Sequence, residues 1–240
     1  MKIKVEKKSR QINTVDDWKR YAPPMEVNKQ WKKGRSAFCL ASFVLSDKFG
    51  AKIQELIESL GLSCPAEFVC EPEAQTSFPV ESMGERGPRN HDLLMVSDDL
   101  LIGIEAKVSE SFADTIKDWK EKGRQNKDGG KNRTKRLEGF CDILYGNNRP
   151  DNLNELRYQL FAATVGTILE AKERGIKKCM MLVLVFEGNV ARESDYDNNV
   201  KKNDEDFGNF CNSLNLPNDG GKITRGEFQC WVKKITVSVD

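Results

Sequence analysis

The fold is decided by residues 92–107, whose sequence is DLLMVSDDLLIGIEAK. Two apolar runs of strand length are separated by a single polar break at residues 97–99, so the chain is expected to fold back there as a β-hairpin. A two-residue turn at Asp98 and Asp99 sets the register. Counting outward from that turn places Asp92 directly opposite Glu105.

This register gathers charged side chains on one patch. Directly opposed residues share a face of the sheet, with their Cβ atoms about 5 Å apart. Glu105 and Lys107 also share a face, because side chains along a strand alternate with period two. Like charges facing each other across a ladder are destabilising, so Asp92 and Glu105 favour a compensating cation. Mg²⁺, a hard ion that prefers oxygen ligands, fits that role, and Mn²⁺ is an expected substitute.

The predicted chemistry follows from these parts. A bound divalent ion polarises a phosphoryl oxygen and lowers the pKa of a bound water. Lys107 is placed to orient that water and to neutralise developing negative charge. The backbone carbonyl of Ala106 is a candidate third ligand beside Asp92 and Glu105. The expected reaction is hydrolysis of a phosphodiester bond.

An aspartate, a spacer and a Glu-x-Lys at the end of the next apolar strand resemble the PD-(D/E)XK nuclease superfamily. Asp92, Glu105 and Lys107 match that motif, although His91 stands where the motif has proline. The resemblance covers about residues 36–186 and implies a restriction-endonuclease-like core. It also implies a nuclease in restriction, phage defence, mobile-element functions or repair, for which we expect DNA as the substrate and RNA as the alternative. A double-strand cut would suggest a homodimer, although no feature of the sequence demands one.

The remaining pattern predicts an α/β protein with a mixed central sheet flanked by helices. We expect one domain over residues 1–240, with an N-terminal arm at 1–30 and a C-terminal extension at 188–240. Residues 1–13 fit an edge strand or a loose arm. Helices are expected at 36–60, 112–120, 134–145, 153–174 and 200–214, strands at 67–70, 77–80, 91–96, 100–108, 178–186 and 229–239, and a loop at 123–133.

Four further residues are candidates for supporting the site. Asn90 falls opposite Lys107 in the hairpin register, where it is a candidate partner for Lys107 or for a phosphate, or simply a residue of the loop-to-strand junction. Glu73 lies near the preceding strand and is a candidate extra acid. Gln159 and Arg157 lie in a helical segment, and helical spacing makes them point apart, so only one of them is expected to face the site.

A basic stretch follows the hairpin. Residues 117–136 hold nine basic side chains against three acidic ones, with glycines among them. This stretch is a candidate phosphate clamp, although charge runs are more often solvated surface. Arg35 belongs to a second basic-aromatic cluster. The candidate nucleic-acid contacts are Arg35, Lys127, Lys131, Arg133, Lys135 and Arg136.

Composition bounds the remaining functions. Of 240 residues, 38% are hydrophobic and 31% charged, and the 38 Lys plus Arg nearly balance the 37 Asp plus Glu, so global charge does not indicate a partner. Seven scattered cysteines and a charged N-terminus predict a cytoplasmic protein without a membrane span. His91 is the single histidine, which excludes two-histidine metal sites.

Two alternatives stay open. The same fold with its basic residues could hold nucleic acid or a protein partner without cleaving. Alternatively, the motif could be accidental, in which case the carboxylates of Asp92 and Glu105 should lie far apart.

Overall fold

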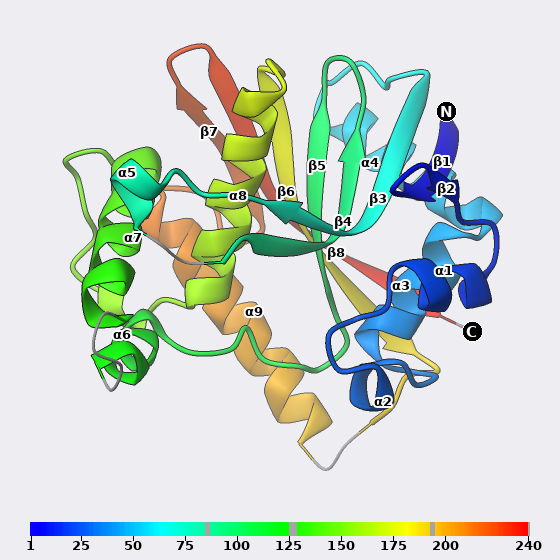
Figure 1. Cartoon of the computed structure of the whole chain (residues 1–240), viewed down its shortest axis with the longest axis horizontal. Coiled ribbons are helices and arrows are strands. Elements are labelled where there is room, and N and C mark those ends of the chain that lie inside the picture. Colours follow the sequence, from blue (N-terminus) through cyan, green and yellow to red (C-terminus); the bar gives the residue numbers. More distant parts are fainter. Residues whose placement is uncertain (85–86, 125–128, 193–194, 240) are drawn as a thin grey trace.

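The computed structural model, described over residues 1–84, 87–124, 129–192 and 195–239, is built on one mixed sheet of eight strands (Figure 1). In spatial order the strands are β2 (Arg10–Gln11), β1 (Lys2–Lys7), β3 (Glu67–Thr76), β4 (Arg89–Val96), β5 (Leu101–Lys107), β6 (Lys178–Gly188), β8 (Phe228–Val239) and β7 (Gly220–Arg225). The pairs β1–β3, β5–β6 and β6–β8 are parallel, and the other four are antiparallel. The predicted α/β class with a mixed sheet is confirmed.

Helices cover both faces of this sheet. They are α1 (Val15–Tyr21), α2 (Val27–Gln30), α3 (Ser36–Val44), α4 (Asp47–Ser59), α5 (Val80–Met83), α6 (Ile116–Arg124), α7 (Gly129–Leu144), the 3₁₀ turn η1 (Leu153–Glu155), α8 (Tyr158–Glu173) and α9 (Tyr196–Ser213). Figure 1 shows α1 to α4 on one side of the sheet and α5 to α9 on the other. In the described part of the chain, no helix combines the length and the apolar character that a membrane crossing needs.

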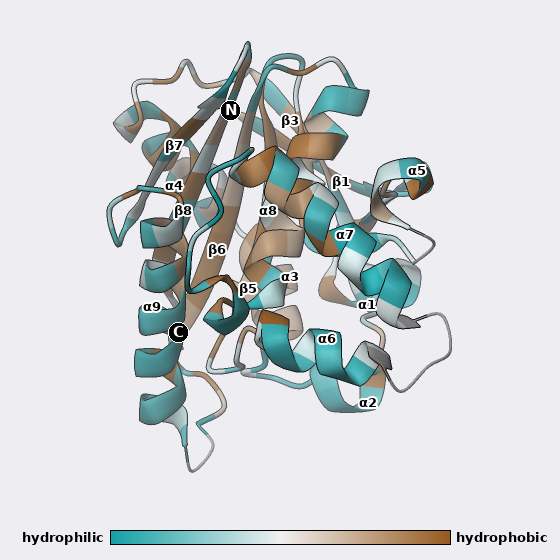
Figure 2. Cartoon of the chain, turned by 90° about the vertical axis from the view of Figure 1, so that its left-hand side faces the viewer, coloured by the Kyte–Doolittle hydropathy of each residue, from teal (hydrophilic) through white to brown (hydrophobic). Residues whose placement is uncertain are grey.

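Two apolar clusters lie between the helices and the sheet. Successive residues of β6 alternate between them: Met180 and Leu182 pack with α3 and α4, while Met181 and Val183 pack with α8. This is why residues 178–186 read as one continuous apolar run, since both faces of the strand are buried. Figure 2 shows β6 in hydrophobic colours and the outer helix α9 mostly in hydrophilic ones.

The hairpin has the predicted register. Val96 pairs with Leu101 and Leu93 with Ile104, and beyond that pair the side chain of Asp92 accepts the backbone N–H of Ala106. The backbone N–H of Ser97 donates to the carbonyl of Leu100 at 3.0 Å, which closes the turn.

β3 and β4 change direction together close to the hairpin (Figure 1). Glu73 has a left-handed backbone with φ of 48° and interrupts the regular pairing of β3 with β4. On β4, Leu93 packs with α3 and α4, but His91 lies against Gly166 of α8, on the opposite face. Strict alternation would put these two residues on the same face. The sheet is therefore creased along the line from Glu73 to Asp92.

Several element predictions were wrong. The helix expected at residues 36–60 is two helices, α3 and α4, because the chain breaks at Leu45 and restarts after Ser46. The strand expected at 67–70 continues to Thr76 as β3, whereas the strand expected at 77–80 does not form: residues 77–79 are irregular and α5 begins at Val80. β3 tolerates Pro72 because β1 pairs only with residues 67–70, which leaves the proline without a partner strand on that side.

The loop expected at residues 123–133 was wrong at both of its described ends, since residues 123–124 end α6 and residues 129–133 begin α7; residues 125–128 of that expected loop lie outside the described residues. The two glycines that begin α7 occupy the first turn, where the N–H groups have no partner within the helix. β7 was not expected, because its sequence is polar and glycine-rich. β1 and β8 place the arm and the extension in the same sheet as the hairpin.

Candidate active site at the end of strands β3 to β5

Three acidic residues form one row across the crease of the sheet. Glu73 falls between the pairs Pro72–Leu93 and Ala74–His91 of the β3–β4 ladder, level with Asp92, and Asp92 accepts the N–H of Ala106 on β5, next to Glu105. The row therefore takes one carboxylate from each of three adjacent strands. We call Glu73, Asp92 and Glu105 the acidic row.

Glu105 is the most strongly held of the three carboxylates. Its side chain is 2% exposed and accepts hydrogen bonds from Arg89, from Gln159 of α8 and, at 3.0 Å, from Lys107 Nζ. Burial alone would raise its pKa, but Lys107 and Arg89 together hold the pKa of Glu105 well below its usual range. Glu105 is therefore ionised and is neutralised by two cations.

Asp92 lies against the backbone of the neighbouring strand. Its Oδ2 accepts the N–H of Ala106 at 2.7 Å, so its carboxylate is fixed beside Glu105. Burial and the charge of Glu105 raise the pKa of Asp92, against the opposing effect of Lys107. The charge of Glu105 therefore disfavours ionisation of Asp92. The role of the Ala106 carbonyl as a metal ligand stays a prediction.

The pKa of Glu73 is raised by the same kinds of cause as that of Asp92. Burial, followed by the charge of Asp92, raises the pKa of Glu73 to about 8. The Nζ of Lys7 donates to the backbone carbonyl of Glu73 at 2.8 Å and to the side chain of Glu71, so this cation does not pair with the carboxylate of Glu73. Glu73 therefore holds a proton near neutral pH and would have to release it to bind a cation.

Lys107 is protonated at this site. Burial works against its charge, but Glu105 and then Asp92 outweigh it and raise the pKa of Lys107. The ammonium group also lies 5.6 Å from the centre of the Phe112 ring. Lys107 can therefore donate hydrogen bonds and stabilise negative charge, but it is no proton acceptor near neutral pH.

The acidic row opens onto a pocket of about 280 Å³. We call it the acidic pocket. Its polar wall consists of Glu73, Arg89, Asn90, Asp92 and Gln159, and the opposite wall comes from α1, α3 and the segment between them. Two of the three carboxylates can thus be reached by a ligand.

A divalent ion fits this site in chemical type. Carboxylate oxygens are the ligands that Mg²⁺ prefers, and Gln159 Oε1 is buried there without a hydrogen-bond partner. Among the described residues, however, no three His, Cys, Asp or Glu side chains stand ready to hold a metal. The carboxylate oxygens of Glu105 already accept hydrogen bonds from Arg89 and Lys107. An ion would therefore have to displace Arg89 from Glu105.

Comparison with protein families places most of the chain in one domain. Residues 11–239 match the model of a domain of unknown function, DUF6946. The chain belongs to this family. The match includes the acidic row and Lys107. No curated protein matches the chain, and no solved structure does either.

Of the supporting residues predicted for this DUF6946 chain, Gln159 and Glu73 lie at the site and Arg157 does not. Arg157 pairs with Asp206 of α9 at 2.8 Å and donates to the carbonyl of Ala113. Asn90 lines the acidic pocket and pairs across the ladder with Gln75 of β3.

Two arginines of the basic stretch, Arg133 and Arg136, contact other segments of the protein. Arg133 donates to the carbonyl of Trp119 and lies over its ring, and Arg136 donates to the carbonyl of Gly87 at 3.1 Å. Both guanidinium groups therefore join α7 to neighbouring segments. Lys131 and Lys135 are exposed on α7, and Arg35 is half-buried at the start of α3. Lys127 lies outside the described residues.

Sequence reasoning missed Arg89. It belongs to residues 84–90, whose glycines and proline predict a loop, but the β3–β4 ladder continues to the pair Thr76–Arg89. It also missed a buried chain of hydrogen bonds behind the row, in which Thr76 Oγ1 lies 2.9 Å from His91 Nε2 and donates to Glu170 of α8 at 2.9 Å. No local pattern in the sequence indicates either contact.

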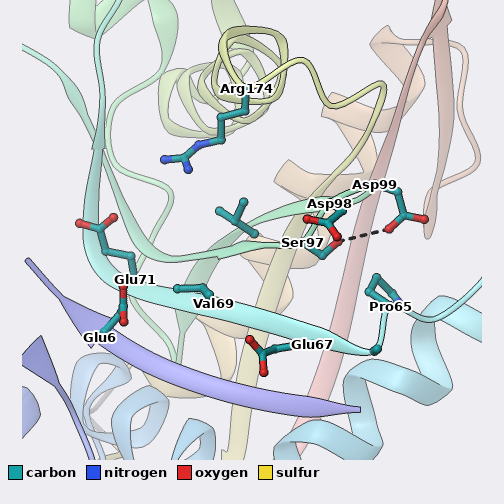
Figure 3. A pocket seen from close by; sticks show the side chains of 11 residues that line it. Glu6, Pro65, Glu67, Val69, Glu71, Ser97, Asp98, Asp99 and Arg174 are labelled. Carbon is teal, nitrogen blue, oxygen red and sulfur yellow. Dashed lines mark hydrogen bonds between the residues drawn. The ribbon is translucent and has the colours of Figure 1, made fainter. Parts of the chain in front are cut away.

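Another pocket of this chain, of about 720 Å³, lies at the hairpin turn, lined by Glu67, Glu71, Asp98, Asp99 and Arg174 among others (Figure 3). Its lining residues include none of the acidic row. Glu67 and Glu71 are paired with lysines of β1. This pocket is therefore separate from the candidate site.

Proposed function

We propose that this DUF6946 protein is a Mg²⁺-dependent nuclease of the PD-(D/E)XK kind, which hydrolyses phosphodiester bonds in DNA, with RNA as the second candidate substrate. The observation that carries the proposal is the acidic row, with three carboxylates on adjacent strands, Lys107 beside them and a pocket in front. A divalent cation would favour the ionised form of all three carboxylates and offset the repulsion among them.

Each residue has a role in this proposal. Asp92 and Glu105 hold the ion, Glu73 is placed to add a third carboxylate, and Gln159 offers its unpartnered oxygen. When bound, the ion would polarise the phosphoryl oxygen and supply an activated water. Lys107, which stays protonated, stabilises negative charge as it develops on the phosphate and orients the attacking water.

Arg89 has one role without a bound ion and another with it. Without an ion it neutralises Glu105, and it also lines the acidic pocket. Once an ion takes its place at Glu105, the guanidinium is available for a phosphate, which arginine binds through two parallel hydrogen bonds.

A cleavage assay tests the proposal. Purified protein is incubated with plasmid, linear duplex, single-stranded DNA and RNA, in Mg²⁺ or Mn²⁺ and in EDTA. We expect cleavage that disappears in EDTA and in Lys107→Met and Glu105→Gln. Lys178→Met and Glu187→Gln, on the neighbouring strand β6, serve as matched controls and should cleave normally. Activity that survives Lys107→Met and Glu105→Gln in folded protein would sink the proposal.

A second candidate is a module that binds nucleic acid without cutting it. It is favoured by the two cations already paired with Glu105 and by the lack of a prearranged metal cluster among the described residues. Under this alternative, binding of labelled DNA is the same in Mg²⁺ and EDTA and is unchanged by Glu105→Ala. Binding that strengthens in Mg²⁺ and loses that gain in Glu105→Ala would favour the nuclease.

A further inference from the structure

A larger pocket adjoins the acidic pocket. It has a volume of about 560 Å³ and shares four lining residues with the acidic pocket: Met25, Arg89, Asn90 and Gln159. Phe78, Trp119 and Tyr158 contribute its aromatic lining, so we call it the aromatic pocket. Its volume is in the range of small-ligand sites. A molecule lying across both pockets would contact the acidic row at one end and aromatic rings at the other.

The aromatic lining is preformed. Tyr158, the first residue of α8, stacks on Trp119 of α6, with 3.8 Å between ring centroids and 12° between planes. Phe140 of α7 lies behind both Tyr158 and Phe78, at 5.9 Å and 5.0 Å. Because the rings hold one another in place, a ligand gains apolar contact here with little loss of side-chain freedom.

The polar lining complements a flat ring with polar edges. Gln75 and Asn90 are cross-strand partners, and each carboxamide carries one donor group and one acceptor. Amides of this kind recognise nucleobases through paired hydrogen bonds. Arg89 also lines this pocket, and its charge suits a phosphate once an ion has replaced Arg89 at Glu105.

We propose that the aromatic pocket binds one unpaired nucleobase of the strand whose phosphate lies at the acidic row. This inference rests on the proposed function and adds a substrate class to it, namely single-stranded nucleic acid or a strand with an unstacked base. A base inside a duplex is stacked on both sides and paired on its edge, so it cannot enter such a pocket without leaving the helix.

Binding measured without cleavage tests this inference. A fluorescently labelled ten-nucleotide DNA strand is titrated with the full-length protein in Ca²⁺, and the titration is repeated with one abasic residue moved along the strand. We expect a single position at which loss of the base weakens binding by roughly tenfold to a hundredfold, the range for loss of a base–aromatic contact. A duplex of the same sequence should bind as weakly as that abasic strand.

A variant that fills the pocket locates the effect. Ala113 is exposed and lines the aromatic pocket, so Ala113→Leu narrows the pocket; because Ala113 has a left-handed backbone with φ of 56°, the variant is first checked for an unchanged thermal unfolding transition. It should weaken binding of the intact strand but leave binding of the sensitive abasic strand unchanged. Ser77→Leu, also exposed and absent from the lining, is the matched control. Gln75→Ala, which only truncates an exposed side chain, should change which base is preferred.

The outcomes separate the two proposals. An abasic effect that Ala113→Leu removes, without cleavage in Mg²⁺, would overturn the nuclease and keep the base pocket. Cleavage in Mg²⁺ with equal affinity for intact and abasic strands at every position would keep the nuclease and overturn the base pocket. Equal affinity for duplex and single strand, unaffected by Ala113→Leu, would also overturn the base pocket.

Discussion

Glu105 is buried with two cations and one amide around it, while within the described part of the chain no cation pairs with the carboxylates of Asp92 and Glu73. The cations of the row are therefore gathered at Glu105. If a metal ion binds Glu105 as proposed, Arg89 competes with it for the same oxygens.

Removing that competitor should strengthen metal binding. We expect Arg89→Met to raise the affinity for Mn²⁺ about tenfold, because a charge-assisted hydrogen bond to Glu105 no longer has to be broken. Calorimetry or the loss of the free Mn²⁺ paramagnetic resonance signal measures this. Arg157→Met, which removes the ion pair with Asp206 outside the site, is the control and should change nothing. Unchanged or weaker Mn²⁺ binding in Arg89→Met would refute the competition.

Glu73 gives the metal-free protein a pH-dependent stability. Its pKa rises from 4.5 to about 8 on folding, so the folded protein keeps a proton that the unfolded chain releases. The free energy of unfolding should therefore fall as the pH rises from about 4.5 to about 8. Asp92 acts in the same direction. In urea denaturation with EDTA, Glu73→Gln should show a shallower decline, and an identical decline in both proteins would contradict the assignment.

At this scale the sequence predicted the hairpin register from Val96–Leu101 to Leu93–Ile104, because a single polar break fixes the register of a hairpin. It did not predict Arg89, whose position depends on how far β3 and β4 pair beyond the crease. Contacts between distant segments of this kind leave no periodic pattern in the chain.

The element that positions Gln159 is α8, which packs closely on β5. A Cβ added at Gly103 of β5 would overlap Thr167 Oγ1 of α8 and come within 3.0 Å of His91 Nδ1. Glycine at this position therefore allows the helix to approach the strand. The approach brings the amide of Gln159 to Glu105.

We expect Gly103→Ala to lower the free energy of unfolding by about 1–3 kcal/mol, the usual cost of overpacking a core. Thr167→Ala removes the overlapping atom and should restore part of that loss in the double variant. Gly50→Ala in α4, where the nearest atom to an added Cβ is 3.7 Å away, is the control and should be neutral or stabilising. Chemical denaturation followed by circular dichroism measures all four proteins. Full stability of Gly103→Ala would show that α8 can move.

Elements were predicted best where one face or both faces of a segment are apolar. β6 and α8 were predicted because their mostly apolar composition indicates that they are buried. The break between α3 and α4 was missed because apolar periodicity continues through Leu45. β7 was missed because its burial is slight, with much of its sequence facing solvent.

Across the whole molecule, the ends of the chain complete the sheet that carries the site. β8 pairs with β6 along its full length, from Lys178 to Gly188. Trp231 and Val232 of β8 are buried in the two apolar clusters. The resemblance to a nuclease core over residues 36–186 could not reveal this dependence, because it concerns only the shared elements.

A fragment ending at residue 188 should therefore fail to fold. It would expose the edge of β6 and its apolar side chains, a combination that promotes aggregation. We expect insoluble protein, or soluble protein without cooperative thermal unfolding, when the fragment is expressed beside the full chain. A soluble fragment with a sharp unfolding transition would show that β7, β8 and α9 are dispensable.

The cysteines give this protein a set of built-in chemical probes. All seven are free thiols; Cys64 is half-buried, and the other six are buried, one each in α3, β3, α7, β6, α9 and β8. Burial raises the pKa of thiols such as Cys70 and Cys211, so they react only when their element opens. Timed alkylation followed by mass spectrometry should label Cys64 first. The order of the remaining six would then report, without any mutation, which layer of the molecule loosens when nucleic acid or a metal ion is added.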